Sequence, residues 1–424
     1  MGVEHFDALE TRDPASREAA LLAALPGQVQ AARTTPAYAD RLAGVDAASV
    51  TTRAALARLP VMRKAELLQR QVAGRTAAET WNPFGGFSAI GWRALGKQGH
   101  ARRVYQSPGP IYEPEGSTTD YWRSARALFA AGFRAGDLVH NSFSYHLTPG
   151  AWIMESGAQA LGCTVFPGGV GNTELQLQAA AELRADGYAG TPSFLRILLE
   201  KAAESGVALP HLQKALLSGE AFPSALRDWL AERGVVGYQC YATADVGLIA
   251  YETSARQGLV VDEGVIVEIV RPGTDDPVPE GEVGEIVVTV LQADYPLLRF
   301  GTGDLSAVLP GQCPTGRSNL RIKGWMGRAD QTTKVRGMFV HPSQVAEVLR
   351  RHPELLKARL VVEGEMANDR MTLKVEALTS PAGLVDAVSA SLRDVTKLRG
   401  DIVLCAPGSL PNDGKVIEDG RTIG

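Results

Sequence analysis

Two patterns of apolar and polar residues divide the first half of the chain. From Ser16 to about Gln71 the apolar residues recur at helical spacing, and Pro26, Pro36 and Pro60 interrupt the pattern. This predicts several short helices that wrap the main body. Further on, short apolar runs alternate with helical patterns, which predicts a parallel sheet with crossover helices. The expected strands cover residues 137–142, 163–166 and 187–189, and the expected helices cover residues 121–131 and 195–203.

After Gly247 the pattern changes to short β-branched runs separated by Gly, Pro and Asp, which predicts a β-rich subdomain. Its expected strands cover residues 259–261, 265–269, 285–290 and 305–309. From about residue 330 the order is strand (333–335), helix (342–350), two strands (358–362 and 371–376), helix (383–396) and strand (401–405). That βαββαβ order is typical of a ferredoxin-like α+β domain. We therefore predict a large α/β body over residues 1–329 and a small, mobile α+β domain over residues 330–424.

Composition narrows the classes of function. The chain has 424 residues, of which 45% are apolar and 21% are charged, and it has no apolar run that could span a bilayer. The net charge of −4 comes from interspersed acidic and basic residues, so a nucleic-acid-binding surface is not expected. The N-terminal residues lack the layout of a secretory signal, which predicts a cytoplasmic protein. The four cysteines lie far apart and indicate neither a disulfide framework nor a metal cluster.

Two segments in the middle of the chain carry candidate chemistry. Residues 241–247 read Tyr-Ala-Thr-Ala-Asp-Val-Gly, which places the ring of Tyr241 four residues before the carboxylate of Asp245. Residues 299–304 read Arg-Phe-Gly-Thr-Gly-Asp, and a carboxylate such as Asp304 can accept both hydroxyls of a ribose.

Two further segments lie nearer the C-terminus. Residues 327–330 read Gly-Arg-Ala-Asp and are followed by a basic run from Lys334. Residues 407–415 read Pro-Gly-Ser-Leu-Pro-Asn-Asp-Gly-Lys. The lysine that ends this frame, Lys415, can offset charge that develops on a transferring oxygen.

In this order, the segments resemble those of the phenylacetate-CoA ligase branch of the adenylate-forming enzymes, and the resemblance runs from about Leu59 to the C-terminus. It implies a large α/β body with a β subdomain and a small C-terminal domain that rotates between two half-reactions. It also implies that Tyr241 meets adenine, that Asp245 helps to hold magnesium and that Asp304 holds the ribose. By the same resemblance, Lys415 reaches the substrate carboxylate and the α-phosphate.

The resemblance assigns further positions. The segment that begins at Phe143 and the glycines that follow Phe166 match the part of the family that binds the acyl group. The residues expected to contact the substrate are Phe143, Tyr145, Gly168 and Gly169. The remaining expected cofactor-binding residues are Gly219, Glu220, Arg299 and Arg328, and Asp330 is the expected hinge.

The chain departs from the family at the phosphate loop. Where the family has a Ser/Thr/Gly run, residues 103–114 read Arg-Val-Tyr-Gln-Ser-Pro-Gly-Pro-Ile-Tyr-Glu-Pro. Phosphate loops work because free backbone N–H groups converge on phosphate oxygens, whereas proline has no N–H and restricts its neighbour. Glu113 and Glu115 would repel a triphosphate. We predict that ATP binds weakly or not at all; the alternative is a divergent loop with phosphate held elsewhere.

A second departure adds chemistry to the acyl-binding segment. His146 stands where the family has a glycine after its second tyrosine. An imidazole has the pKa needed to deprotonate a thiol near neutral pH, so we predict that His146 is a catalytic base. The alternative is a histidine that only packs or faces solvent. The family's cysteine segments read Glu252-Thr253 and Cys313-Pro-Thr315 here, and one thiolate is too few for a metal site.

Three functions remain open from the sequence. The first is transfer of an aryl or acyl group from a CoA thioester to the phosphopantetheine thiol of a carrier protein without ATP. The second is an ATP- and magnesium-dependent aryl-CoA ligase, and the third is a non-catalytic protein that binds acyl-CoA or a carrier protein. The expected partners are an aryl- or acyl-CoA, a carrier protein and a second copy of the chain in a homodimer. Nucleic acid and membrane are not expected.

Overall fold

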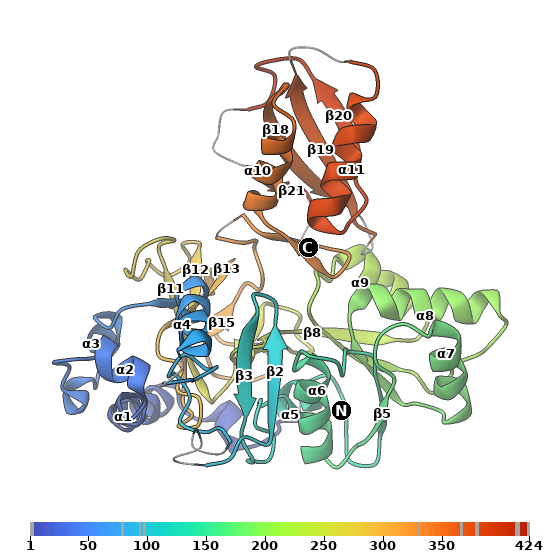
Figure 1. Cartoon of the computed structure of the whole chain (residues 1–424). Helices are drawn as coiled ribbons and strands as arrows, with labels where there is room; N and C mark the ends of the chain where they lie inside the picture. The colour runs from blue at the N-terminus through green and yellow to red at the C-terminus, as the bar shows by residue number, and fades with distance from the viewer. Residues whose placement is uncertain are drawn as a thin grey trace. The chain divides into compact units, whose positions relative to one another are not determined.

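The computed structural model describes residues 4–77, 80–92, 95, 99–329, 331–364, 368–377, 381–411 and 416–421. The chain folds into two compact units (Figure 1). One unit holds the residues up to Gly219 together with Leu230–Trp325, and the other holds Glu220–Trp229 and the residues from Met326 onward. The domain boundary after residue 329 and the rotation of the small domain stay predictions.

Short helices open the first unit. The longest, α1, continues through Pro26, so the expected break at this residue is wrong. The helix tolerates the lost hydrogen bond because Leu21, Leu25 and Val29 lie four residues apart on one buried face and pack into the main core. The helices are η1 (Ala8–Thr11), α1 (Pro14–Arg33), α2 (Pro36–Arg41), η2 (Ala47–Ser49), α3 (Arg53–Ala57) and α4 (Lys64–Thr76).

The centre of this unit is a nine-stranded sheet in the order β14-β15-β10-β9-β8-β7-β6-β4-β5. The strands from β8 to β5 are parallel and the others are antiparallel, so the expected parallel sheet with crossover helices is present. The parallel strands are β4 (Leu138–Asn141), β5 (Thr164–Pro167), β6 (Gly187–Gly190), β7 (Lys214–Leu217) and β8 (Val236–Thr243). The antiparallel strands are β9 (Gly247–Glu252), β10 (Leu259–Val261), β14 (Val308–Leu309) and β15 (Arg321–Ile322).

The order in which the chain adds parallel strands to the sheet reverses at β4. β5 lies on one side of β4 and β6 lies on the other. Right-handed crossovers therefore place α6 on one face of the sheet and α7 and α8 on the opposite face. Ligands of open α/β sheets bind beyond the carboxyl ends of the strands at such a point. The helices are α5 (Ala125–Ala130), α6 (Gly150–Ala160), α7 (Thr173–Glu182), α8 (Pro192–Glu204) and α9 (Ser224–Ala231).

A second sheet has the order β1-β13-β12-β11. Its strands are β1 (Met62–Arg63), β11 (Val265–Val270), β12 (Gly284–Val290) and β13 (Phe300–Ser306). The single strand expected over residues 305–309 is instead the end of β13 and the whole of β14, which lie in different sheets. The buried Ala307 separates them, so the chain crosses from one sheet to the other at this residue.

The second unit contains a four-stranded sheet in the order β20-β19-β18-β21. The strand expected at 333–335 does not join this sheet but pairs with residues 338–340, because Arg336 and Gly337 both have positive φ and close a two-residue hairpin. The short strand β21 takes the fourth place, beside β18. The elements are β16 (Thr333–Val335), β17 (Met338–Val340), α10 (Pro342–Arg351), β18 (Leu355–Glu363), β19 (Arg370–Ala377), α11 (Leu384–Thr396), β20 (Asp401–Cys405) and β21 (Ile417–Asp419).

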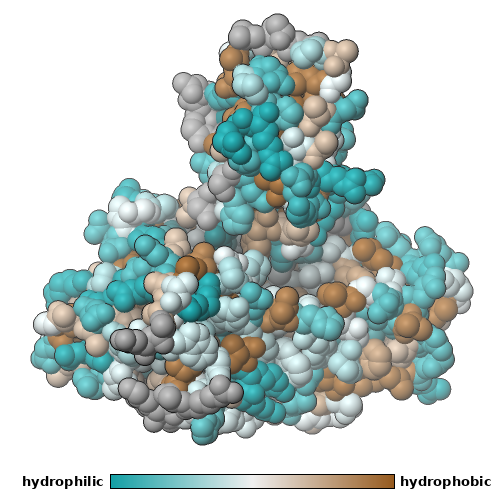
Figure 2. Space-filling view, viewed as in Figure 1, coloured by the Kyte–Doolittle hydropathy of each residue, from teal (hydrophilic) through white to brown (hydrophobic). Residues whose placement is uncertain are grey.

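Each unit has its own apolar core. The two large cores of the first unit lie around the second sheet and around the parallel strands, and a third core fills the second unit. On the face shown in Figure 2, apolar residues are interspersed with polar ones. Within the described part of the chain, no helix combines the length and the apolar character that a membrane span requires.

Candidate functional site

The segment that corresponds to the phosphate loop is a β-hairpin. Residues Arg103–Ser107 (β2) pair with Ile111–Glu115 (β3) in an antiparallel ladder, with Pro108, Gly109 and Pro110 between them. The outer edges are also occupied, because Gln106 N donates to the Leu147 carbonyl at 2.8 Å and Tyr112 N donates to Gln71 Oε1 at 2.8 Å. A phosphate loop needs backbone N–H groups that face the ligand. Here these groups are used by the hairpin and its neighbours.

Gln71 of α4 holds the hairpin in place. Its side chain is fully buried, accepts from Tyr112 N and donates from Nε2 to the Tyr112 carbonyl at 2.9 Å. Both backbone groups of one residue in β3 are thus satisfied by a single amide. Arg75, one turn later on the same helix, lies over the Tyr112 ring at 5.1 Å. The hairpin is therefore a fixed part of the body.

Replacing Gln71 by leucine should measurably loosen this attachment. The variant leaves a buried N–H and a buried carbonyl without a partner, so the free energy of unfolding should fall by about 1–3 kcal/mol. Urea denaturation measures the change. The exposed Gln69 lies on the same helix, and Gln69→Leu should change stability by less than about 0.5 kcal/mol. Equal effects of the two substitutions would contradict the anchoring role.

The buried Glu113 of the hairpin lies against Asp245, the acid that the resemblance expects to hold magnesium. Glu113 accepts from Ser107 Oγ at 2.6 Å through Oε1, while Glu113 Oε2 and Asp245 Oδ1 are buried and lack a hydrogen bond donor. Burial and the neighbouring Asp245 carboxylate raise the pKa of Glu113 well above its ordinary value. Lys64 Nζ lies 3.0 Å from Asp245 Oδ2. The ammonium thus pairs with one oxygen of the acid that the resemblance assigns to magnesium.

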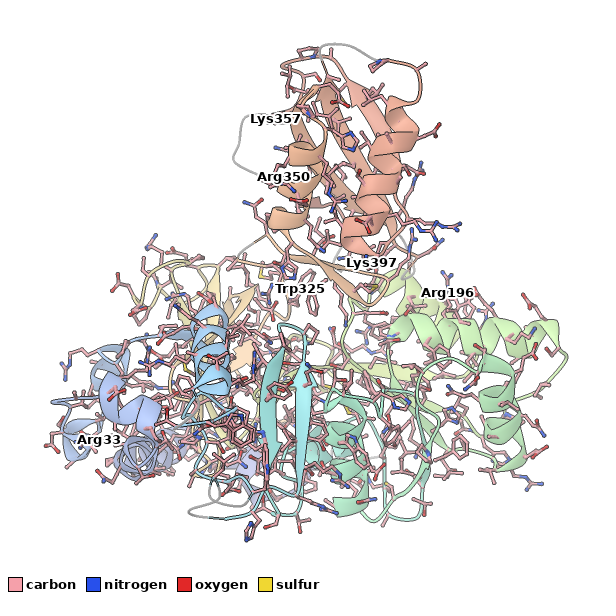
Figure 3. All side chains as sticks on the ribbon, in the orientation of Figure 1. Arg33, Arg196, Trp325, Arg350, Lys357 and Lys397 are labelled. Carbon is pink, nitrogen blue, oxygen red and sulfur yellow. The ribbon has the colours of Figure 1, made fainter. Side chains whose placement is uncertain are left out.

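The predicted ribose-binding acid has polar partners on both oxygens. Tyr241 Oη donates to Asp304 Oδ2 at 2.7 Å, and Trp325 Nε1 donates to Asp304 Oδ1 at 3.0 Å. Trp325 is labelled in Figure 3. Tyr241 and Asp304 are therefore brought together, as predicted for a nucleotide site. To bind a ribose in a bidentate grip, however, Asp304 would have to exchange both of these bonds. In this structure, one oxygen of Asp245 and both oxygens of Asp304 thus already have partners within the protein.

Arg299 lies in the interior of the first unit, and its expected role in cofactor binding stays a prediction. Its side chain is fully buried. Its Nε donates to Glu268 at 3.0 Å, its Nη1 donates to the carbonyls of Ala57 and Leu59, and its Nη2 donates to the Asp275 carbonyl at 2.8 Å. Arg299 joins the N-terminal helices to the β-rich part of the body.

The predicted acyl-binding residues lie at the carboxyl ends of β4 and β5, where the strand order reverses. Phe143 and Tyr145 follow β4, and Gly168 and Gly169 follow β5. The Tyr145 hydroxyl donates to Glu155 Oε2 at 2.7 Å and accepts from Asn141 Nδ2 at 2.9 Å, and its ring packs edge-on against Trp152. The fold thus places these residues where open α/β sheets bind ligands.

His146 lies on the loop after β4 and is exposed to solvent. Its backbone is held by Ser144, whose Oγ accepts from His146 N and donates to the His146 carbonyl, each at 3.1 Å. The next residue, Leu147, has a φ of 62° and bonds the hairpin through its carbonyl. His146 is therefore an exposed residue, directly after Tyr145 in the sequence, on a loop whose backbone is held in place.

The remaining predicted residues are not all placed by the structure. Lys415 and Asp330 lie outside the described residues. Gly219 follows β7 with a φ of 81° in the first unit, whereas Glu220 and Arg328 belong to the second. The sequence reading did not select Lys64 as a site residue, although the residue begins a helix in a segment that resembles the family. The local sequence around a lysine on an amphipathic helix does not indicate which distant acid will pair with it.

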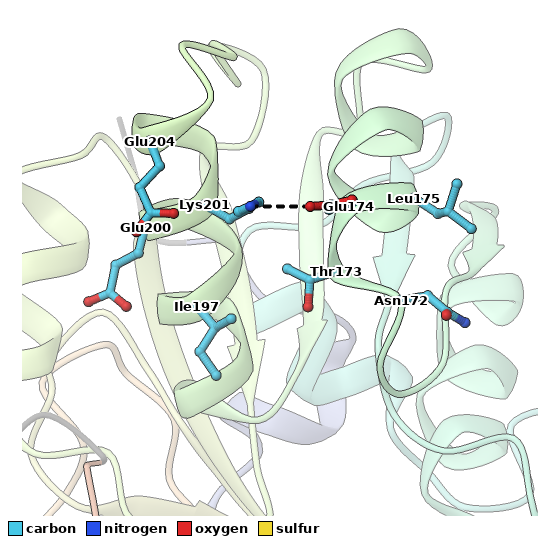
Figure 4. Close-up of a pocket in the computed structure, with 8 residues that line it drawn as sticks. All are labelled: Asn172, Thr173, Glu174, Leu175, Ile197, Glu200, Lys201 and Glu204. Atoms are coloured by element: carbon cyan, nitrogen blue, oxygen red, sulfur yellow. Dashed lines mark ion pairs between the residues drawn. The ribbon is translucent and has the colours of Figure 1, made fainter.

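A surface cavity of about 500 Å³ lies between α7 and α8 (Figure 4). Charged residues dominate its rim, and Lys201 pairs with Glu174 at 3.2 Å. No residue of the predicted site lines it. The lining residues are Asn172, Thr173, Glu174, Leu175, Ile197, Glu200, Lys201 and Glu204.

Comparisons with known proteins show the family of the chain. Residues 123–290 match the family described as AMP-binding enzyme. The chain is 32% identical over 352 residues to a phenylacetate-coenzyme A ligase of Thermus thermophilus, covering 79% of this chain and 75% of the relative. It is 33% identical to a phenylacetate-coenzyme A ligase of Aromatoleum evansii, covering 65% of each chain.

Solved structures give the same fold. A 2-hydroxyisobutyryl-CoA ligase in complex with an adenylate and CoA matches with a TM-score of 0.78 at 24% identity, over 98% of this chain and 92% of that chain. This confirms the predicted fold class, a large α/β body with a β subdomain and a small α+β domain.

Proposed function

Because the chain belongs to the phenylacetate-CoA ligase branch of the adenylate-forming enzymes, we propose that it transfers an aryl or acyl group from CoA to the phosphopantetheine thiol of a carrier protein without ATP. Membership makes it an enzyme of the CoA ligase family. The proposal concerns the reaction, the acceptor and the independence from ATP.

One observation carries the proposal. The hairpin that replaces the phosphate loop engages backbone N–H groups within its ladder and with its neighbours Leu147 and Gln71. It also brings the buried Glu113 against Asp245, whose Oδ2 pairs with Lys64. A triphosphate with magnesium would need free N–H donors and a free carboxylate at these places. An enzyme that keeps the acyl-binding segment but fills the phosphate site is suited to a substrate that is already activated.

Transfer between two thiols needs no nucleotide. The carrier thiol loses its proton to His146, and the thiolate attacks the thioester carbonyl carbon of the acyl-CoA. The bond between this carbon and the CoA sulfur then breaks, and the CoA thiolate takes the proton from the imidazolium. Reactant and product are both thioesters, so the enzyme supplies proximity and proton transfer.

The second candidate is an ATP- and magnesium-dependent aryl-CoA ligase. The names of the two relatives favour it, and Asp304, Asp245 and Lys415 would then act as they do in the family. This reaction requires that Lys64 and the hairpin leave the site, or that phosphate binds elsewhere.

A mass-spectrometric assay separates the candidates. The protein is incubated with phenylacetyl-CoA and a holo carrier protein, and in a second reaction with phenylacetate, CoA, ATP and magnesium. We expect an acylated carrier in the first reaction and no pyrophosphate in the second. An apo carrier without phosphopantetheine is the control and should stay unmodified. A panel of other aryl- and acyl-CoAs extends the first reaction, because the acyl group is unknown.

Calorimetry tests the independence from ATP by measuring the affinity of the protein for magnesium-ATP. Magnesium-ATP should bind with a dissociation constant above about 1 mM, which corresponds to a binding free energy weaker than about −4 kcal/mol. Micromolar affinity for ATP, or release of pyrophosphate, would favour the ligase. A protein that performs neither reaction but binds acyl-CoA would be the non-catalytic alternative.

A further inference from the structure

A buried glutamine of α7 connects the ends of two neighbouring strands. Gln176 is 3% exposed, and its Oε1 accepts from His140 Nε2 at 2.7 Å and from Ser142 Oγ at 3.1 Å. Its Nε2 donates to the carbonyls of Gly169 at 2.9 Å and Gly171 at 2.6 Å. One side chain therefore joins the end of β4 to the glycine loop after β5.

The four contacts fix the orientation of every group in the cluster. Two carbonyls can only face the NH₂ group of Gln176, so the other end of the amide is the oxygen. His140 must then donate from Nε2, and burial lowers the pKa of His140, which favours the neutral ring with its proton on Nε2. The His140 ring stacks on Phe166, the third residue of β5, with ring centroids 5.2 Å apart. The cluster has a single hydrogen-bonding arrangement.

The glycine loop fits closely around this amide. A Cβ on Gly168 would lie 2.6 Å from Gln176 Oε1 and 2.9 Å from His140 Nε2, so no side chain fits there without movement. Gly169 and Gly171 have φ of 69° and 73°, which glycine adopts without strain. Gln176 thus supplies the hydrogen bonds to two carbonyls of the loop, and the glycines allow the positive φ angles of its backbone.

The same loop touches the aromatic residue of the acyl-binding segment. Gly169 N donates to the Asn141 carbonyl at 3.0 Å, and the Cβ position of Gly169 lies 3.9 Å from the Tyr145 ring. Asn141 in turn donates to the Tyr145 hydroxyl. Any shift of the loop changes the space beside Tyr145.

We propose that Gln176 is a positioning residue that sets the shape of the acyl pocket and thereby the preference for aryl over small acyl groups. This inference rests on the proposed function only in taking the segment around Tyr145 as the place of the acyl group. Gln176 itself is too buried to act on the thioester. Its effect passes through the loop formed by Gly168 and Gly169.

Binding and turnover of two thioesters test the proposal. Gln176→Leu removes all four bonds, and Gln176→Glu keeps an acceptor for His140 and Ser142 but sets an oxygen against the two glycine carbonyls. Phenylacetyl-CoA and acetyl-CoA serve as probes, with dissociation constants from calorimetry and KM and kcat from the transfer assay. In both variants, the affinity for phenylacetyl-CoA relative to acetyl-CoA should fall at least tenfold, with KM affected more than kcat.

The control lies two residues further on the same helix. Gln178 is exposed and its Nε2 donates to Glu182 of the same helix, so Gln178→Leu should leave the ratio unchanged within twofold. Circular dichroism confirms that each variant is folded, and the glutamate variant keeps the test valid if the leucine variant unfolds.

The binding ratio does not depend on which reaction the enzyme performs. If the wild type shows no transfer but the ratio falls in the variants, the proposed function fails and the role of Gln176 stands. An unchanged ratio in a folded variant overturns the role of Gln176, whether or not transfer occurs. If the wild type binds phenylacetyl-CoA no better than acetyl-CoA, the assigned preference for aryl groups is wrong.

Discussion

His146→Ala is expected to slow acyl transfer by about 10²–10⁴-fold, because general-base assistance by a positioned side chain contributes that much. The reason lies in the loop after β4, which fixes the backbone of His146 and leaves its imidazole exposed beside Tyr145. Initial rates of carrier acylation, measured by intact mass at saturating acyl-CoA, give the change. Binding of acyl-CoA and the melting temperature should stay the same.

Substitutions of His211 and Lys415 are the comparisons for His146→Ala. His211 is exposed on the loop before β7, and His211→Ala should retain the full rate. Lys415→Ala should matter less than it would in a ligase, since its family role is in adenylation. If His146→Ala keeps full transfer activity while Lys415→Ala abolishes it, the base assignment is wrong and the ligase-like use of Lys415 is the better explanation.

Arg299→Ala should lower the free energy of unfolding by about 3–5 kcal/mol, which is the usual cost of breaking a buried ion pair from one side. The substitution leaves the buried Glu268 carboxylate without its cation and removes donors from the carbonyls of Ala57, Leu59 and Asp275. Urea denaturation followed by circular dichroism measures the loss.

A double variant and a surface control sharpen this prediction. Arg299→Met with Glu268→Leu removes both charges and should recover part of the lost stability, because an apolar pair of similar volume needs no partner. Arg271 is 60% exposed and pairs with Glu282 at 3.6 Å, so Arg271→Ala should cost less than about 1 kcal/mol. A loss in Arg299→Ala as small as in Arg271→Ala would show that the buried pair has no structural role.

The sequence predicted the parallel sheet well because a strand that is covered on both faces needs a short apolar run, and 187–189, which lies in the fully buried β6, is such a run. The small strands β1, β14 and β15 were less visible, since two residues cannot show a period. The hairpin of β16 and β17 was missed for a different reason. Its turn is formed by Arg336 and Gly337, and arginine is rarely chosen for a positive φ.

Motif spacing predicted which site residues meet, but not what they contact. Tyr241 and Asp304 were expected in one site and do meet, through a hydrogen bond of 2.7 Å. Arg299 precedes Asp304 by five residues in the same motif, yet it points into the core, because its φ of 43° turns the chain just before β13 begins.

Contacts between distant segments escaped the sequence altogether. Lys64 and Asp245 are 181 residues apart, and Gln176 reaches His140 across 36 residues. No local pattern of apolar and polar residues encodes such a pair. The prolines and acids of the hairpin can be read from the sequence, and they led to the prediction that ATP binds weakly or not at all. The partner of each acid could be identified only from the structure.

The contacts of Arg299 also bear on how the chain matures during synthesis. Its guanidinium bonds carbonyls 242 and 240 residues earlier, and β1 pairs in parallel with β13 at Met62 and Phe300. At a translation rate of roughly 5–20 residues per second, this long interval lasts on the order of 10–50 s. During that time Leu56, Leu59 and Met62, all buried in the finished protein, have left the ribosome without their partners. The nascent N-terminal helices thus lack their contacts with Arg299 and β13 until the ribosome has made those residues.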